Sequence, residues 1–149
     1  MNSFLTAIVD NKILMVSMIA WALAQLLKML VYYCILKEFS IERMFGAGGM
    51  PSSHSALVVS LSTAIGMVEG VESTNFAIAV VLAGVVMYDA TGVRQAAGKH
   101  AKAINRIVKQ LSSKNTFDDI SLKELLGHTP IEVIVGALLG FFVAYIFTK

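Results

Sequence analysis

The stretch GGMPSSHSALVVSLS, residues 48–62, joins a cluster of glycine, proline and serine to the beginning of an apolar run. Gly48 and Gly49 allow close approach of the backbone, and Pro51 is tolerated in the first turn of a helix. The stretch therefore predicts a helix that begins in a polar loop and continues into an apolar environment. The free N–H groups of its first turn, together with the helix dipole, would favour an anion.

The same stretch carries side chains that suit phosphate chemistry. Ser52 and Ser53 supply hydroxyl donors beside Gly49, and His54 can give or take a proton near neutral pH. A helix start with a histidine near a membrane interface is also common without any function. The motif alone therefore leaves an anion site and an ordinary helix N-terminus as alternatives.

The composition is that of an integral membrane protein. Of the 149 residues, 56% are hydrophobic and 15% are charged, whereas charged residues make up about a quarter of soluble domains. Mean hydropathy is +0.72. The N-terminus lacks the basic region and cleavage site of a signal peptide, so the first apolar run should stay in the mature protein. No linker, repeat or low-complexity tract divides the chain, which predicts a single integral membrane domain over residues 1–149. The lone Cys34 excludes a disulfide or cysteine metal site within one chain, and a net charge of +2 does not indicate a nucleic acid partner.

Four apolar segments approach the roughly 20 residues that a helix needs to cross the hydrocarbon core. They cover residues 13–36, 56–71, 76–93 and 131–147. The segment 94–111 places apolar and basic residues on opposite faces at helical spacing, as an interfacial amphipathic helix does. We therefore expect an all-α, multi-pass membrane helical bundle with about four transmembrane helices and one interfacial amphipathic helix.

Lysine and arginine are concentrated in two loops, residues 37–55 and 94–129, which four spans place on the same side. The positive-inside rule puts both loops in the cytoplasm and both termini outside. The protein is accordingly expected in the cell membrane, with the motifs around His54 and His128 facing the cytoplasm together.

His128 and Glu132 lie four residues apart at the start of the last apolar segment. A carboxylate one helical turn away can hold one imidazole N–H and leave the other nitrogen free as a nucleophile or base. Thr129, Pro130 and Glu132 fit a capping box with proline at the first helical position equally well. The sequence leaves both interpretations open.

Three further ionisable residues lie in or beside apolar segments. Asp89 closes the third segment and Arg94 follows five residues on, so the two can pair with each other or bind a ligand. Arg94 suits bidentate recognition of a phosphate. Lys28 lies inside the first segment and should face the bundle rather than lipid, which makes it another candidate phosphate ligand.

Two of these motifs resemble signatures of a known superfamily. PSSHS at residues 51–55, followed by LGHTPIEVIVGALLG at residues 126–140, is similar to two motifs of the type 2 phosphatidic acid phosphatase and vanadium haloperoxidase superfamily. With YDATGVRQAAG at residues 88–98 between them, the chain from residue 25 to residue 140 resembles its small divergent branch.

The resemblance implies a role for each matching residue. His128 would be the nucleophile that forms a phosphohistidine, Glu132 would orient it, and His54 would protonate the leaving alkoxide. Ser52 keeps the serine of the superfamily motif, whereas Ser53 replaces its glycine. The implied mechanism is double displacement without a metal or cofactor.

The chain also departs from the superfamily pattern. Glu132 replaces an aspartate, and Leu122 stands where an arginine is expected, with Lys123 one residue away and Arg94 as a substitute from the preceding span. The superfamily's first motif has no match. Members usually have six membrane helices, so a chain with about four predicts a more open site or one that a second subunit completes in a homo-oligomer.

These observations predict a membrane lipid-phosphate phosphatase that hydrolyses a phosphomonoester, with His128, His54 and Glu132 as catalytic residues. The predicted substrate-binding residues are Ser52, Ser53, Gly49, Arg94, Lys28, Lys123 and Asp89. The alternative is a catalytically inactive lipid-phosphate binding protein, transporter or flippase on the same scaffold, which the missing cations favour. A third is a structural subunit, expected if His128 faces outward and Glu132 only caps the helix. No metal site is expected, because no spacing groups the oxygen ligands that Asp89, Asp118 and Asp119 offer.

Overall fold

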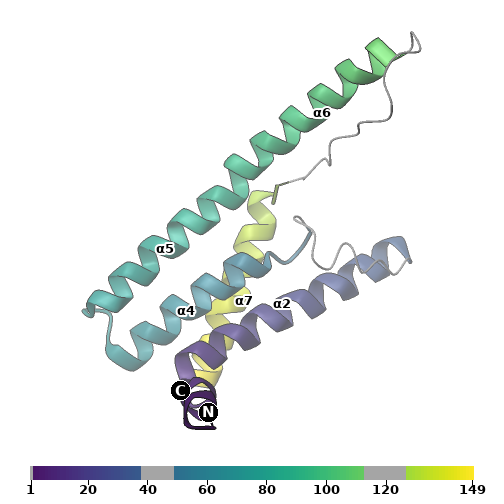
Figure 1. The fold of residues 1–149 in the computed structure, drawn as a ribbon. Helices are drawn as coiled ribbons and strands as arrows, with labels where there is room; N and C mark the ends of the chain where they lie inside the picture. The colour runs from purple at the N-terminus through teal and green to yellow at the C-terminus, as the bar shows by residue number, and fades with distance from the viewer. Residues whose placement is uncertain (1, 38–48, 113–126) are drawn as a thin grey trace.

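A computed structural model describes residues 2–37, 49–112 and 127–149 of the chain. Every regular element within these ranges is an α-helix, which confirms the expected all-α fold (Figure 1). The helices are α1 (Asn2–Val9), α2 (Lys12–Leu36), α4 (Ser53–Glu69), α5 (Thr74–Thr91), α6 (Val93–Ser112) and α7 (Pro130–Thr148).

Three stretches of helix in the described part of the chain are long and apolar enough to cross a membrane. They are Lys12–Cys34, Thr74–Gln110 and Pro130–Thr148. The span expected at residues 56–71 corresponds to α4, a 17-residue helix that is not among them. The multi-pass membrane bundle is therefore confirmed, while the count of four spans stays a prediction.

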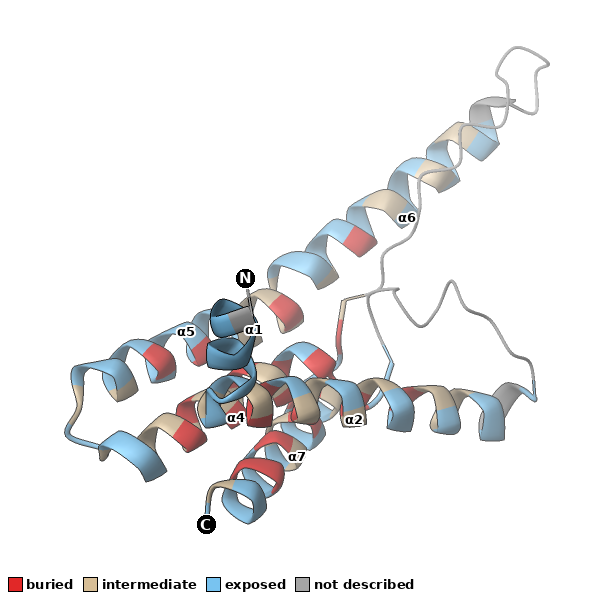
Figure 2. Cartoon of the chain, turned by 60° about the horizontal axis from the view of Figure 1, so that its bottom comes forward, coloured by how far each residue is buried: buried red, intermediate tan, exposed pale blue. Residues whose placement is uncertain are grey.

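α4 lies at the centre of the bundle, where it packs against α2, α5 and α7. Figure 2 shows buried residues along α4 and on α7 where the two helices meet. Ser60 and Ser62 are buried on α4, and their hydroxyls donate to carbonyls of the same helix at 2.9 and 3.0 Å. Their polar groups are therefore satisfied without water, as a buried helix requires.

Two glycines allow α7 to lie directly against the backbone of α4. A Cβ at Gly136 would collide with the carbonyl oxygen of Ser52, and one at Gly140 with that of Ala56. Glycines four residues apart on one helix face permit such close approach between membrane helices. This contact fixes the start of α4 against the first turns of α7.

The helix expected at residues 94–111 is present as α6, and it continues the direction of α5 beyond the bundle (Figures 1 and 2). The two helices are separated at Gly92, whose N–H donates to Tyr88 O at 2.8 Å. The attachment of α6 to the membrane surface stays a prediction. The short helix α1 was not expected from the sequence. Asn11, which follows it, is the N-cap of α2, and its side-chain oxygen accepts the Leu14 N–H.

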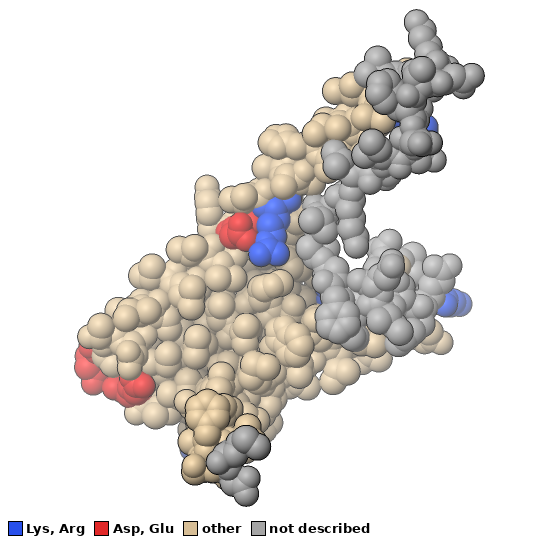
Figure 3. All heavy atoms as spheres, in the orientation of Figure 1, with Lys and Arg blue, Asp and Glu red and all other residues tan. Residues whose placement is uncertain are grey.

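Both termini lie at the end of the bundle away from the start of α7 (Figure 1). The Lys12 ammonium donates to Thr148 O at 3.3 Å, which joins the beginning of α2 to the end of α7. Figure 3 shows this face of the bundle to be mostly uncharged, with adjacent acidic and basic patches near the α5–α6 junction. The termini therefore share one end, as expected; which side of the membrane that end faces stays a prediction.

Candidate functional site

Three segments far apart in the sequence meet at one end of the bundle: the entry to α4, the α5–α6 junction and the entry to α7. His128 N donates to Ala90 O at 3.0 Å, and Ser52 N donates to Glu132 O at 3.0 Å. Gly127 lies against the backbone at Gln95, where a Cβ would collide. Backbone contacts thus hold the residues around both histidine motifs together.

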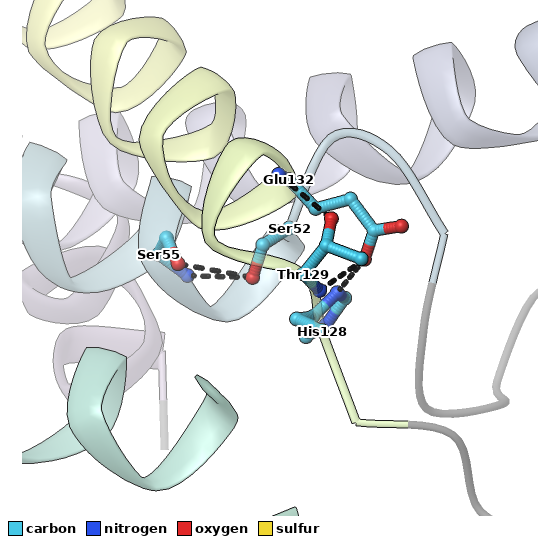
Figure 4. Close-up of polar contacts among 5 residues, drawn as sticks. All are labelled: Ser52, Ser55, His128, Thr129 and Glu132. Atoms are coloured by element: carbon cyan, nitrogen blue, oxygen red, sulfur yellow. Dashed lines mark hydrogen bonds and ion pairs between the residues drawn. The ribbon is translucent and has the colours of Figure 1, made fainter. Parts of the chain in front are cut away.

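His128 is 4% exposed and lies just before α7, and its Nδ1 lies 2.9 Å from Oε2 of Glu132 (Figure 4). A carboxylate accepts a hydrogen bond from the N–H at this nitrogen, so in the neutral ring the proton stays on Nδ1 and Nε2 keeps its lone pair. The arrangement leaves one imidazole nitrogen available for proton transfer or nucleophilic attack, and it holds the ring in a fixed orientation.

The capping box is present as well, so the two interpretations of Glu132 are not exclusive. Oε2 of Glu132 accepts the Thr129 N–H at 3.1 Å, and Glu132 N donates to Oγ1 of Thr129 at 3.4 Å (Figure 4). The same oxygen therefore caps α7 and contacts His128.

The entry to α4 is organised by Ser52. This residue is the N-cap, and its Oγ accepts both the N–H and the hydroxyl of Ser55, at 3.4 and 3.0 Å (Figure 4). Pro51 directly precedes this N-cap, so it stands at the entry to the helix and outside its first turn. Ser52 and Ser53 are both buried, at 0% and 5% exposure. His54, the next residue, is exposed.

His54 lies in the first turn of α4, outside the three candidate spans. Partial burial lowers its pKa below the usual 6.5, and the positive charges of Arg94, His128 and Lys28 lower it further, while Asp89 opposes them. His54 is therefore within electrostatic reach of the other histidine and of cations from α2 and α6.

Lys28 reaches this region from α2. Its side chain is 9% exposed and lies against Gly49, where a Cβ would come 2.9 Å from Cε of Lys28. Gly49 also has a φ of +90°, a conformation that side chains rarely adopt. Lys28 interacts electrostatically with Glu132. Gly49 thus makes room for a buried ammonium near the carboxylate that orients His128.

Arg94 and Asp89 form an ion pair in which Nε lies 2.7 Å from Oδ2. The two side chains are 46% and 39% exposed. The pairing that the sequence allowed is therefore formed, on the open side of the site. Lys123, Leu122, Asp118 and Asp119 fall outside the described residues. Within residues 2–37, 49–112 and 127–149, no group of three or more His, Cys, Asp or Glu side chains could hold a metal ion.

Three residues of the site were missed by sequence reasoning. Ala90 contributes a backbone carbonyl, Ser55 a second hydroxyl at the α4 cap, and Gly127 a close approach to α6. A backbone carbonyl leaves no trace in residue type. For Gly127 and Ser55 the sequence did carry a signal, because each directly neighbours a histidine of the two motifs.

The described part of the chain is an all-helical membrane protein in which the two histidine motifs meet at one end of the bundle. The chain belongs to the Divergent PAP2 family, whose model matches residues 9–143. It is 37% identical over 144 residues to "Uncharacterized membrane protein YuiD" of Bacillus subtilis (strain 168), which covers 89% of this chain and 91% of that protein. No solved structure matches the chain.

Proposed function

We propose that this protein is a membrane lipid-phosphate phosphatase that hydrolyses a phosphomonoester through His128. The observation that carries the proposal is the 2.9 Å contact between Nδ1 of the buried His128 and Glu132. A second histidine, His54, interacts electrostatically with His128. A buried imidazole held by a carboxylate is the arrangement that activates a histidine for nucleophilic or base catalysis.

In the proposed mechanism Nε2 of His128 attacks phosphorus, and the bond from phosphorus to the lipid oxygen breaks. His54 donates its proton to the departing alkoxide, which leaves as the lipid alcohol, and Glu132 stabilises the positive charge on the phosphorylated ring. His54 then takes a proton from water as the water attacks phosphorus. Inorganic phosphate leaves and the His128 ring is restored.

The proposed binding groups for the phosphoryl oxygens are Lys28, Arg94 and the first-turn N–H groups of α4. Cations and helix N-termini stabilise negative charge that develops in a transition state. The ligand is a lipid because the site lies at one end of apolar helices, and the cytoplasmic leaflet is proposed from the basic loops. Lys123 belongs to the same set of proposed binding groups. We also propose that the chain forms a single domain and assembles as a homo-oligomer.

The ion pair of Asp89 with Arg94 favours a second candidate function. A guanidinium already neutralised by a carboxylate binds phosphate less strongly, which suits a protein that holds or moves a lipid phosphate without hydrolysing it. The two candidates involve the same residues and differ only in chemistry.

Phosphate release distinguishes them. The full-length protein in liposomes would be given phosphatidic acid, a phosphatidylglycerophosphate and a polyprenyl phosphate, with and without EDTA. We expect release that resists EDTA and is lost in His128→Ala, while His100→Ala, a change at an exposed histidine of α6, keeps it. If the folded protein binds a lipid phosphate but releases no phosphate from it, the phosphatase is overturned and the second candidate, binding or transport, takes its place.

A further inference from the structure

An open apolar groove of about 590 Å³ lies beside the candidate site, between α5 and α7. α5 contributes Met87 and Tyr88, α7 contributes Ile134 and Leu138, and Val59 of α4 forms the floor. The groove exists because α5 and α7 both pack against α4 but touch each other little. In a bilayer this opening faces lipid.

One end of the groove adjoins the candidate catalytic residues. Pro130 and Thr91 line that end. Pro130 is two residues after His128, and the residue before Thr91, Ala90, accepts the His128 N–H at 3.0 Å. A molecule whose polar head lay at His128 would therefore enter the groove with the part attached to it.

The lining suits a hydrocarbon chain rather than a head group. Tyr88 and Thr91 are the lining residues with hydroxyl groups in the described part of the chain, and both lie toward the site end. The Thr91 hydroxyl donates to Met87 O at 3.1 Å within its own helix. Along the rest of the groove the side chains offer no partner for a charged or hydroxylated group.

The length of the groove matches one leaflet of a bilayer. It follows α7 from Pro130 to Phe141, which at 1.5 Å per residue is about 16 Å. The hydrocarbon core of a bilayer is about 30 Å thick, so each leaflet contributes about half of that. A chain of a lipid in the same leaflet as the site would run beside the groove over this depth.

From this continuity, lining and length we propose that the groove between α5 and α7 binds a hydrocarbon chain of the lipid phosphate whose head group lies at His128. The inference rests on the proposed function for the identity of the head group. In this proposal, Ile134 and Leu138 contact the hydrocarbon chain and select substrates by its length.

The test is a matched pair of substitutions on α7. Ile134→Trp enlarges a side chain that lines the groove, whereas Ile146→Trp makes the same change at a residue that faces outward elsewhere; the two isoleucines are 58% and 67% exposed. We expect Ile134→Trp to lower kcat/KM for long-chain phosphatidic acid at least about tenfold and to leave a short-chain, water-soluble phosphomonoester unaffected. Ile146→Trp should change neither rate.

A second readout does not depend on hydrolysis. A non-hydrolysable phosphonate analogue of phosphatidic acid, with a photoreactive diazirine midway along one acyl chain, would be cross-linked to the protein in liposomes. Mass spectrometry should find the label on groove residues of α5 and α7, and Ile134→Trp should reduce it while Ile146→Trp does not.

The outcomes separate the two proposals. Label confined to the groove without hydrolysis of any substrate would support the groove and overturn the phosphatase. Hydrolysis of long-chain substrates unchanged by Ile134→Trp, with label spread over all lipid-facing helices, would overturn the groove and keep the phosphatase.

Discussion

Nδ1 of His128 and Oε2 of Glu132 lie 2.9 Å apart, and the same carboxylate oxygen accepts the Thr129 N–H at 3.1 Å. One oxygen therefore both holds the imidazole and caps α7. The orientation of the His128 ring therefore depends on the residue at which α7 begins. Because the carboxylate has both contacts, variants that misorient the His128 ring can be compared with variants that only weaken the α7 cap.

Glu132→Gln should lower kcat about 100-fold or more with little change in KM, because an amide cannot stabilise the charged ring as a carboxylate does. Thr129→Val is the comparison: it removes the capping hydroxyl and should cost about 1 kcal/mol of stability while activity persists. Steady-state kinetics and thermal unfolding of both variants check this. Equal losses of activity in the two would show that Glu132 acts only as a cap.

Gly136→Ala should destabilise the protein by about 1–3 kcal/mol, since the added methyl group meets the carbonyl oxygen of Ser52 and forces α4 from α7. Gly84→Ala is the matched control, because nothing lies within 4 Å of a Cβ there. That change should be neutral or stabilising by up to about 1 kcal/mol. Denaturation in detergent measures both; a Gly136→Ala protein as stable as the control would contradict the close approach of the two helices.

Lys28→Gln should raise KM for a lipid phosphate by about tenfold, because it removes a buried positive charge near the proposed phosphate position. Lys99→Gln on α6 removes an exposed lysine and should leave KM unchanged. Kinetics with long-chain phosphatidic acid in liposomes provide the comparison. If Lys28→Gln lowered only thermal stability, its ammonium would serve the fold and not the ligand.

The pH dependence should report on His54. Partial burial and then Arg94 lower its pKa, so the protonated form needed to release the alkoxide is lost as pH rises through a value below 6.5. In the pH profile of kcat/KM, the activity should therefore fall on the alkaline side with a midpoint below pH 6.5. Arg94→Gln removes a positive charge and should raise this pKa, which moves the limb to higher pH whatever happens to the overall rate. An unmoved limb, or one moved to lower pH, would show that His54 is not the acid.

The sequence predicted much of the helical architecture from local signals. Each of these signals lies in adjacent residues: the apolar runs, the Thr129–Pro130–Glu132 cap and the polar entry before Ser53. The structure confirms the all-α membrane fold that they predicted, and it shows that α7 begins at Pro130. The short α1 was not predicted, because its eight residues carry too little pattern.

The candidate site depends on contacts that composition does not encode. Charge counts could not reveal that Lys28 of α2 lies against Gly49, or that Ala90 O holds the backbone of His128. The sequence by itself determined which residues are apolar, which cap helices and which have side chains that suit phosphate chemistry, because those properties are local. The sequence also predicted, from the count of spans, that the two histidine motifs lie on the same side. Only the tertiary structure decided that the backbones around them are in contact, because that requires glycines of α7 to bring its backbone against α4.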